Sequence, residues 1–219
     1  MNVMILAAGL GERMRPLTDT IPKPLLKVGD HALIEHQLTA LAATGFTRAV
    51  INVHYLADMM IEVLGDGSRY GIEIAYSREE RLLGTAGGIR RALPLLGQRA
   101  FAVVNADIYT DFDFGRLPRD LGGKLGHLVM VDNPPWHPEG DFGLDANGVL
   151  TMGPGCLTYG CISVYDPALF AGGKEGPQPM RELYDPAVAR GELTGEHFRG
   201  DWHNVGTPEQ LVALNSMLE

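Results

Sequence analysis

VMILAAGLGERMRPLT, residues 3–18, opens the chain with an apolar run followed at once by two glycines and two arginines. The run from Val3 to Ala7 is typical of a strand that is covered on both faces. In open α/β sheets, ligands bind outside the carboxyl ends of the parallel strands, where this stretch leaves the first strand. Glycine lets backbone N–H groups approach phosphate oxygens closely, and arginine adds a planar, permanent positive charge. The stretch therefore predicts a strand that leads into an anion-binding loop.

Strand and helix patterns alternate along the chain up to residue 125. Strands are expected at 49–55, 72–77 and 100–107, and helices at 32–45, 57–67 and 87–96. Further strands are expected at 127–132, 148–152 and 159–166, and closing helices at 180–191 and 208–218. Strands that alternate with helices imply a mostly parallel sheet. We predict one domain over residues 1–219 with an α/β fold, a Rossmann-like three-layer arrangement in which helices flank a mixed, mostly parallel central sheet.

Composition limits the classes of partner. The net charge of -9 over 219 residues argues against nucleic acid and membranes as partners, because non-specific binding to either needs a basic surface. The sequence shows neither an apolar run of membrane-span length nor a signal-peptide layout, so a cytoplasmic location is expected. Cys156 and Cys161 have no zinc-ligand spacing and are expected to be reduced thiols.

Positive charge gathers in the segment after the first strand. Arg13 and Arg15 are followed by Lys23, which stands between two prolines that stiffen the backbone. One interpretation is a simple turn with solvent-facing arginines. A dinucleotide-binding loop fails because Met14 stands where its third glycine belongs, and a Walker A loop fails because no Gly-Lys-Ser/Thr occurs. The remaining interpretation is a loop of another kind that binds a nucleoside triphosphate.

This segment resembles the signature of the sugar-nucleotide nucleotidyltransferases, which join a nucleoside triphosphate to a sugar 1-phosphate and release pyrophosphate. The family pattern G-x-G-x-R-x-x-P-x-T followed by P-K-P is matched at Gly9, Gly11, Arg13, Pro16, Thr18 and residues 22–24. Three further stretches match in order: LLGTAGGI at 82–89, VVNAD at 103–107 and DWHNVGTPE at 201–209. The likeness covers nearly the whole chain, from residue 1 to about 215.

Within that family, four stretches are most similar to the bacterial N-acetylmuramate α-1-phosphate uridylyltransferases, which recycle cell-wall sugar. They are GERMRPLT at 11–18, LGDGSRYGIEI at 64–74, DNPPWHPEGDFGL at 132–144 and TGEHFRGDWHNVGTPE at 194–209. The resemblance implies UTP and a sugar 1-phosphate as substrates and a monomer or homodimer. Mannose- or heptose-1-phosphate guanylyltransferases and glucose-1-phosphate thymidylyltransferases share the core and remain alternatives.

The resemblance also implies roles for single residues. Arg13 and Lys23 would be the catalytic cations on the phosphates, and Asp107 would hold Mg²⁺. The implied nucleotide contacts are Ala8, Gly9, Gly11, Glu80, Gly84, Thr85 and Asn105. The implied sugar contacts are Asp141, Thr158 and Gly160.

Alternatives remain open around the metal and the activity. Asn204 stands where the family commonly has a second metal-binding aspartate, so either Asn204 or Asp201 completes the site. Asp111 is an alternative to Asp107, and the loop around Trp136 is either an ordered surface loop or a lid near the sugar. The missing carboxylate also supports a non-enzyme hypothesis, a nucleotide-sugar sensor that binds nucleotide without turnover. A dinucleotide-dependent oxidoreductase is disfavoured.

Overall fold

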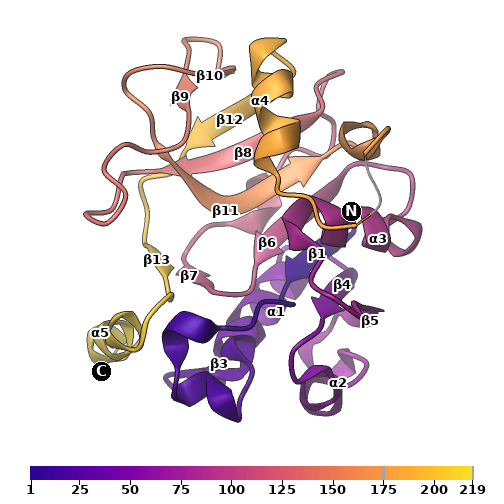
Figure 1. The fold of residues 1–219 in the computed structure, drawn as a ribbon, viewed down its shortest axis with the longest axis vertical. Helices are drawn as coiled ribbons and strands as arrows, with labels where there is room; N and C mark the ends of the chain where they lie inside the picture. Colours follow the sequence, from indigo (N-terminus) through magenta and orange to yellow (C-terminus); the bar gives the residue numbers. More distant parts are fainter. Residues whose placement is uncertain (174–175, 219) are drawn as a thin grey trace.

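Strand β1 (Val3–Leu6) is an inner strand of the seven-stranded sheet that organises the computed structural model of the chain (Figure 1). The structure describes residues 1–173 and 176–218. Across the sheet, the strands follow the order β12, β8, β11, β6, β1, β4, β5. Their bounds are Arg48–Val53 for β4, Glu73–Arg78 for β5, Phe101–Asn105 for β6, Gly126–Val131 for β8, Thr158–Tyr165 for β11 and Leu193–His197 for β12.

One strand of the sheet, β11, runs opposite to the other six. Strands β1, β4, β5 and β6 pair in parallel, whereas β11 runs antiparallel to both β6 and β8. The edge strand β12 pairs in parallel with β8. The predicted mixed, mostly parallel sheet is confirmed. Strand β12 was not predicted, because only Leu193 of its residues is fully buried and the rest carry no apolar run.

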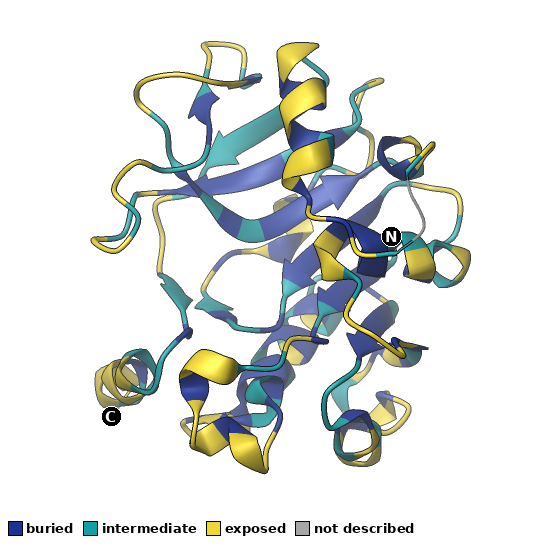
Figure 2. Cartoon of the chain, viewed as in Figure 1, coloured by how far each residue is buried: buried dark blue, intermediate teal, exposed yellow. Residues whose placement is uncertain are grey.

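Helices cover both faces of the sheet, which makes three layers (Figures 1 and 2). Val3 and Ile5 pack into one core with α1 (Leu33–Ala43) and α2 (Ala57–Leu64). Met4 points to the opposite face and joins a second core with α3 (Gly84–Leu96) and α4 (Arg181–Ala189). This alternation follows from the two-residue period of a strand. The continuous apolar run of β1 is therefore explained by burial on both sides.

Short elements extend the fold around this sheet. Three small antiparallel pairs join β2 (Lys27–Val28) to β3 (His31–Ala32), β7 (Ile108–Thr110) to β13 (Trp202–Asn204), and β9 (Gly143–Leu144) to β10 (Leu150–Thr151). Among the described residues, no helix combines the length and the apolar character that a bilayer crossing needs.

The last helix, α5 (Pro208–Leu218), packs against the segment that follows β1. Leu214 is buried in a separate apolar cluster with Met14 and Val205, and with Leu26, Val28 and Leu33. Asn215 strengthens the contact, since its side-chain oxygen accepts a 2.8 Å hydrogen bond from the backbone N–H of Gly29. The end of the chain thus supports the loop near its beginning.

Replacing Leu214 by Ala is expected to lower the free energy of unfolding by about 2–5 kcal/mol, because the truncation leaves a cavity under α5. Val212→Ala on the same helix is the matched control, since Val212 is 65% exposed and Leu214 only 2%. The control is expected to change stability by less than about 0.5 kcal/mol. Equilibrium unfolding in urea measures both values. Equal losses in the two variants would show that α5 is not anchored through this cluster.

Candidate active site

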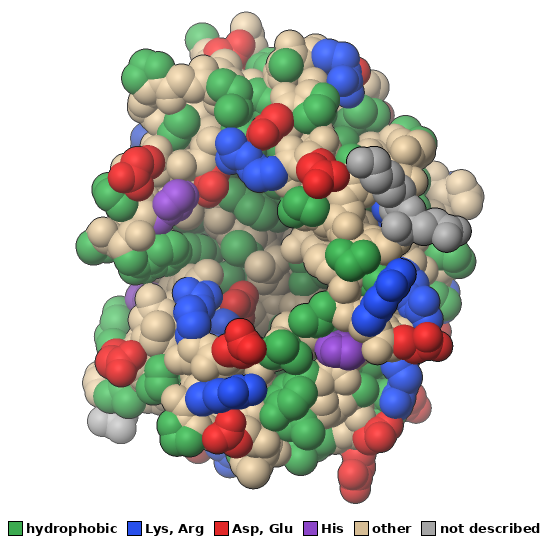
Figure 3. All heavy atoms as spheres, in the orientation of Figure 1, with side chains coloured by type: hydrophobic (Ala, Val, Ile, Leu, Met, Phe, Trp, Pro, Cys, Tyr) green, Lys and Arg blue, Asp and Glu red, His purple; other side chains and the backbone are tan. Residues whose placement is uncertain are grey.

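The parallel register brings several polar residues to one edge of the sheet. Leu6, the last residue of β1, lies beside Asn52 of β4 on one side and Asn105 of β6 on the other. A cleft of about 620 Å³ opens beyond this edge. The face of the molecule drawn in Figure 3 is hollowed across its middle. The cleft is therefore where the carboxyl ends of parallel strands are expected to place a ligand.

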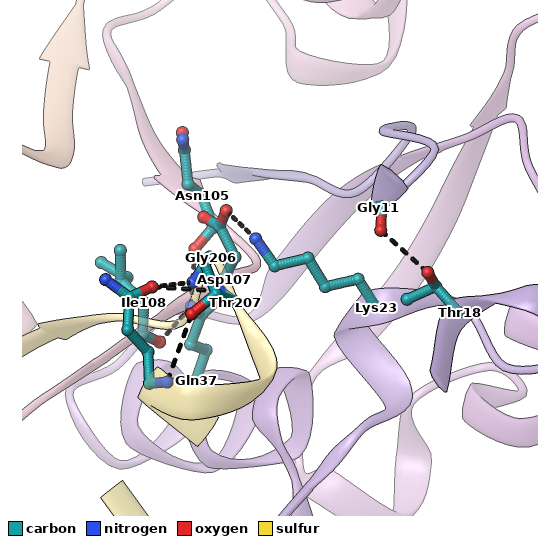
Figure 4. A network of polar contacts seen from close by, with 10 residues as sticks. Gly11, Thr18, Lys23, Gln37, Asn105, Asp107, Ile108, Gly206 and Thr207 are labelled. Atoms are coloured by element: carbon teal, nitrogen blue, oxygen red, sulfur yellow. Dashed lines mark hydrogen bonds and ion pairs between the residues drawn. The ribbon is translucent and has the colours of Figure 1, made fainter. Parts of the chain in front are cut away.

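The loop after β1 forms one wall of the cleft. Ala8, Gly9, Gly11 and Arg13 all line it. Gly11 has a φ of 65°, and a Cβ atom there would lie 2.9 Å from the Thr18 methyl group. The Thr18 hydroxyl donates a 2.8 Å hydrogen bond to the Gly11 carbonyl (Figure 4). Glycine is thus needed at position 11 both for its backbone conformation and for the close fit of the loop.

Two cations of this loop have different surroundings. Arg13 lines the cleft, close to the late segment, because a Cβ atom on Gly206 would lie 3.3 Å from its Nη2. The Arg15 side chain is 58% exposed and pairs with Asp19 at 3.4 Å. Arg15 is not among the residues that line the cleft. The structure therefore brings Arg13 to the site and leaves Arg15 at the surface.

Lys23 and Asp107 meet across the cleft. Lys23 belongs to the short 3-10 turn Lys23–Leu25, and Asp107 follows β6. The Lys23 Nζ lies 2.5 Å from Oδ2 of Asp107, and the two side chains are only 12% and 25% exposed (Figure 4). Both residues also line the cleft. The candidate phosphate-binding cation and the candidate metal ligand are thus paired with each other.

Gln37 holds the turn that carries Asp107. This side chain is buried on α1, and its Nε2 donates hydrogen bonds to the carbonyls of Asn105 at 2.7 Å and Ile108 at 3.0 Å (Figure 4). The two carbonyls flank Asp107 in the chain. Sequence analysis missed Gln37, although an amide on the apolar face of a predicted helix was a signal for a buried polar role.

The donor atoms around Asp107 fit a divalent cation that is shared with a ligand. Its Oδ1 atom is buried and has no hydrogen-bond partner. Within the described part of the chain, no three His, Cys, Asp or Glu side chains are grouped to hold a metal ion. Mg²⁺ is commonly bound through one or two carboxylates together with substrate phosphates. Asp107 thus offers one free carboxylate oxygen, and phosphates would have to supply the other ligands.

None of the other candidates for the metal site lines the cleft. Asn204 pairs with Ile108 across β13 and β7, and the N–H of Val205 donates to the Asp107 carbonyl at 2.8 Å. Asp201 and Asp111 contact each other, since Oδ1 of Asp111 accepts a 2.8 Å bond from the Asp201 N–H. The geometry therefore favours Asp107 over Asp111 as the carboxylate that faces the cleft.

One expected nucleotide contact, Glu80 in the loop after β5, does not line the cleft. Glu79, not Glu80, lines the cleft. The Glu79 carboxylate is buried and accepts hydrogen bonds from Asn52 Nδ2 at 2.7 Å and from the Leu83 N–H at 3.1 Å. Glu80 lies in a separate hollow beside Arg81. Neighbouring side chains of an extended segment point in opposite directions, so the sequence pattern alone did not distinguish the two glutamates.

Helix α3 begins at the cleft. Gly84 and Thr85, its first residues, both line the cleft, as does Asn105. Gly84 has a φ of 64°, and a Cβ atom there would lie 2.9 Å from the Gln178 carbonyl oxygen. A side chain at position 84 would therefore be strained and would collide with the neighbouring segment.

A second pocket of about 300 Å³ adjoins the cleft, with which it shares Leu6, Thr85 and Asn105. Asp141 lines this pocket and accepts a 2.8 Å hydrogen bond from the Tyr159 N–H. Thr158 and Gly160 do not line it. Thr158 is turned toward Asn133, and the Gly160 carbonyl accepts a bond from Trp202 Nε1. Tyr159 and Cys161, which directly follow Thr158 and Gly160 in the chain, line the pocket instead.

The floor of the second pocket is uncharged. Tyr159 donates a 2.8 Å hydrogen bond to Ser163, and the Tyr165 and Tyr184 hydroxyls contact each other. Burial raises the pKa of Tyr159 and of Tyr184 well above its usual range. Burial, with the charges of Asp107 and Asp141, also raises the pKa of the Cys161 thiol. The thiol is thus held in its protonated, unreactive form, in agreement with the free cysteine that was expected.

Arg181 lies at the wall of the second pocket. It is the only Lys or Arg among the described residues that line it. Its guanidinium lies 4.9 Å from the centre of the Phe142 ring, and its Nε lies 2.9 Å from the Asp185 carboxylate. Sequence analysis did not single out Arg181, because nothing in its local sequence connects α4 with the pocket.

Trp136 lies outside both pockets. Its side chain is 54% exposed, and its ring stacks on that of His137, which pairs with Asp141 at 3.4 Å. This geometry favours a surface loop that ends beside the second pocket.

Known proteins resemble the whole chain in sequence. It is 43% identical to the N-acetylmuramate alpha-1-phosphate uridylyltransferase of Neisseria meningitidis serogroup B, over 99% of this chain and 98% of the relative. It is 34% identical to the protein of that name from Caulobacter vibrioides, over 98% and 96%. A mannose-1-phosphate guanyltransferase of Aspergillus oryzae is 32% identical over 97% of this chain and 63% of the relative.

Solved structures share the fold. A putative glucose-1-phosphate thymidylyltransferase from Bacillus anthracis superimposes with a TM-score of 0.84 at 21% identity, over 99% of this chain and 94% of the other. HddC from Yersinia pseudotuberculosis gives a TM-score of 0.84 at 18% identity, over 100% and 99%. Residues 2–147, which include the cleft loop, Lys23 and Asp107, match the nucleotidyl transferase family. The chain therefore belongs to the nucleotidyl transferase family.

Proposed function

We propose that the protein transfers the uridylyl group of UTP to N-acetylmuramate α-1-phosphate, which yields UDP-N-acetylmuramate and pyrophosphate. The family uses nucleoside triphosphates and sugar 1-phosphates as substrates. The observation that carries the reaction type is the meeting of Arg13, Lys23 and Asp107 in one cleft. Full-length relatives that bear this name support the choice of substrates. We place the reaction in cytoplasmic recycling of cell-wall sugar, carried out by a monomer or homodimer.

The chemistry follows from the charges of the two substrates. An oxygen of the sugar phosphate attacks the α-phosphorus of UTP, and the bond from that phosphorus to the bridging oxygen of pyrophosphate breaks on the opposite side. Two anions must meet, so fixed positive charge is needed to offset their repulsion. We assign Arg13 to the β- and γ-phosphates and Lys23 to the α-phosphate or the sugar phosphate. The attacking oxygen is already ionised, so no side chain has to remove a proton.

Members of this family generally use a divalent metal ion. We propose Mg²⁺, held by the free oxygen of Asp107 and by phosphate oxygens, with Asn204 of β13 or Asp201 as the residue that would complete the site. The ion would neutralise charge that develops on the phosphates. The cleft loop, with Ala8, Gly9 and Gly11, would supply backbone donors, and Gly84 and Thr85 would lie beside the base.

The second pocket supports a sugar that carries a carboxylate. It adjoins the cleft, and its tyrosine hydroxyls suit uncharged groups of a sugar. Muramate differs from glucosamine by a lactyl ether with a free carboxylate. Arg181 offers the only Lys or Arg side chain among the described residues that line this pocket. We therefore assign Arg181 to the lactyl carboxylate.

Replacing Arg13 by Gln is expected to lower turnover by about 10²- to 10³-fold, since it removes a fixed charge from the departing pyrophosphate. Arg15→Gln is the matched control, because it removes the same charge from the exposed side of the same loop. Release of pyrophosphate measures both. Near-full activity of the Arg13 variant would contradict the assigned role.

The substrates are tested by crossing UTP, dTTP, GTP, CTP and ATP with the 1-phosphates of N-acetylmuramate, N-acetylglucosamine, glucose and mannose. The highest kcat/KM is expected for UTP with the muramate ester. A preference for GTP and mannose 1-phosphate would keep the mechanism and contradict the proposed pathway. Binding of UTP without release of pyrophosphate from any pair would favour the sensor hypothesis.

Arg181→Gln is expected to lower kcat/KM for N-acetylmuramate 1-phosphate by about tenfold, because a charge-assisted hydrogen bond at a half-exposed site is of that order. Turnover of N-acetylglucosamine 1-phosphate, which lacks the lactyl group, is expected to stay as it was. The ratio of the two kcat/KM values is the measurement. A parallel loss with both sugars would mean that Arg181 supports the pocket and does not bind the carboxylate.

A further inference from the structure

The Lys23–Asp107 pair conflicts with the roles that its two members have during the reaction. The Nζ atom lies 2.5 Å from Oδ2, in a cleft where both side chains are largely shielded from water. A divalent cation on Asp107 would lie close to the ammonium charge and would be repelled by it. A phosphate that binds Lys23 would also compete with Asp107 for the ammonium group. The ion pair and the binding of a metal ion by Asp107 therefore compete with each other.

The described residues offer Lys23 no second acidic partner. Asp107 is the only carboxylate with which Lys23 forms an ion pair there. Glu79, which also lines the cleft, is already engaged by Asn52 and by the Leu83 N–H. An unpaired ammonium group in a shielded cleft is unfavourable. An anionic ligand in the cleft would therefore have to provide the charge that lets Lys23 leave.

We propose that Lys23, paired with Oδ2 of Asp107, weakens the binding of a divalent cation by this carboxylate until a nucleoside triphosphate draws the lysine away. The divalent cation then binds with the nucleotide and not before it. The inference rests on the proposed function, because it takes a triphosphate as the ligand of the cleft. Since coupling between two ligands is reciprocal, the cation also strengthens binding of the nucleotide. Lys23 thereby keeps Asp107 from holding a metal ion in the empty enzyme.

The test is the affinity for Mn²⁺ in the absence of nucleotide, measured from the electron paramagnetic resonance signal of the free ion. Lys23→Met, which keeps most of the aliphatic chain and removes the charge, is expected to bind Mn²⁺ about tenfold more tightly than the wild type, or more. Lys23→Arg keeps the charge and is expected to bind as weakly as the wild type. Arg13→Met removes a cation of the same cleft that is not paired with Asp107, and is expected to leave Mn²⁺ affinity unchanged.

Adding Asp107→Asn to Lys23→Met is expected to abolish the gain. Equal Mn²⁺ affinity of the wild type and Lys23→Met would overturn the inference, as would a gain that survives the loss of Asp107. A crystal structure with UTP and the cation is expected to show Lys23 on a phosphate oxygen, and a retained pair with Asp107 there would also overturn it. None of these measurements needs turnover. An enzyme that couples the ion to UTP but releases no pyrophosphate would contradict the proposed function alone.

Discussion

The parallel pairing of β1 with β4 on one side and with β6 on the other is the constraint on which the site depends. This register aligns Leu6, Asn52 and Asn105 at one edge of the sheet. The loop after β1 and the turn that carries Asp107 consequently leave the sheet toward the same cleft. A shift of one residue in either pairing would turn these strand ends to the opposite faces. Burial of β1 on both faces makes such a shift costly, because every residue of the strand would lose its packing.

Charge in the cleft is partly balanced by an internal ion pair. The chain is acidic, with a net charge of -9, yet Arg13 and Lys23 are concentrated beside Asp107. Pairing Lys23 with Asp107 avoids leaving either charge unpartnered in a shielded site. A triphosphate brings several negative charges, which redistribute these contacts. In our proposal Lys23 thus has two roles: it pairs with Asp107, and with Arg13 it provides the positive charge for the reaction.

The site is completed from both ends of the chain. Met14 of the cleft loop packs with Val205 and with Leu214 of α5, far away in the sequence. Gly206 approaches Arg13 so closely that a side chain there would be crowded. Gln37, from a third segment, fixes the turn around Asp107. The position of the phosphate-binding groups thus depends in part on Gln37, Val205 and Leu214, which are not among the residues that line the cleft.

The sequence by itself determined the alternating strands and helices, the anion-binding loop and the placement of Arg13, Lys23 and Asp107 at one sheet edge. The alternation and the loop with Arg13 depend on local periodicity, on glycine and arginine spacing, and on the rule that parallel strands end together, whereas Lys23 and Asp107 were assigned to the site by their likeness to the family motifs. Only the tertiary structure decided that Glu79 and not Glu80 reaches the cleft, that Tyr159 and Cys161 face the second pocket in place of Thr158 and Gly160, and that Lys23 pairs with Asp107. The physical reason is that the direction of a side chain and its partner across the fold depend on register and packing between distant segments, which local sequence does not encode.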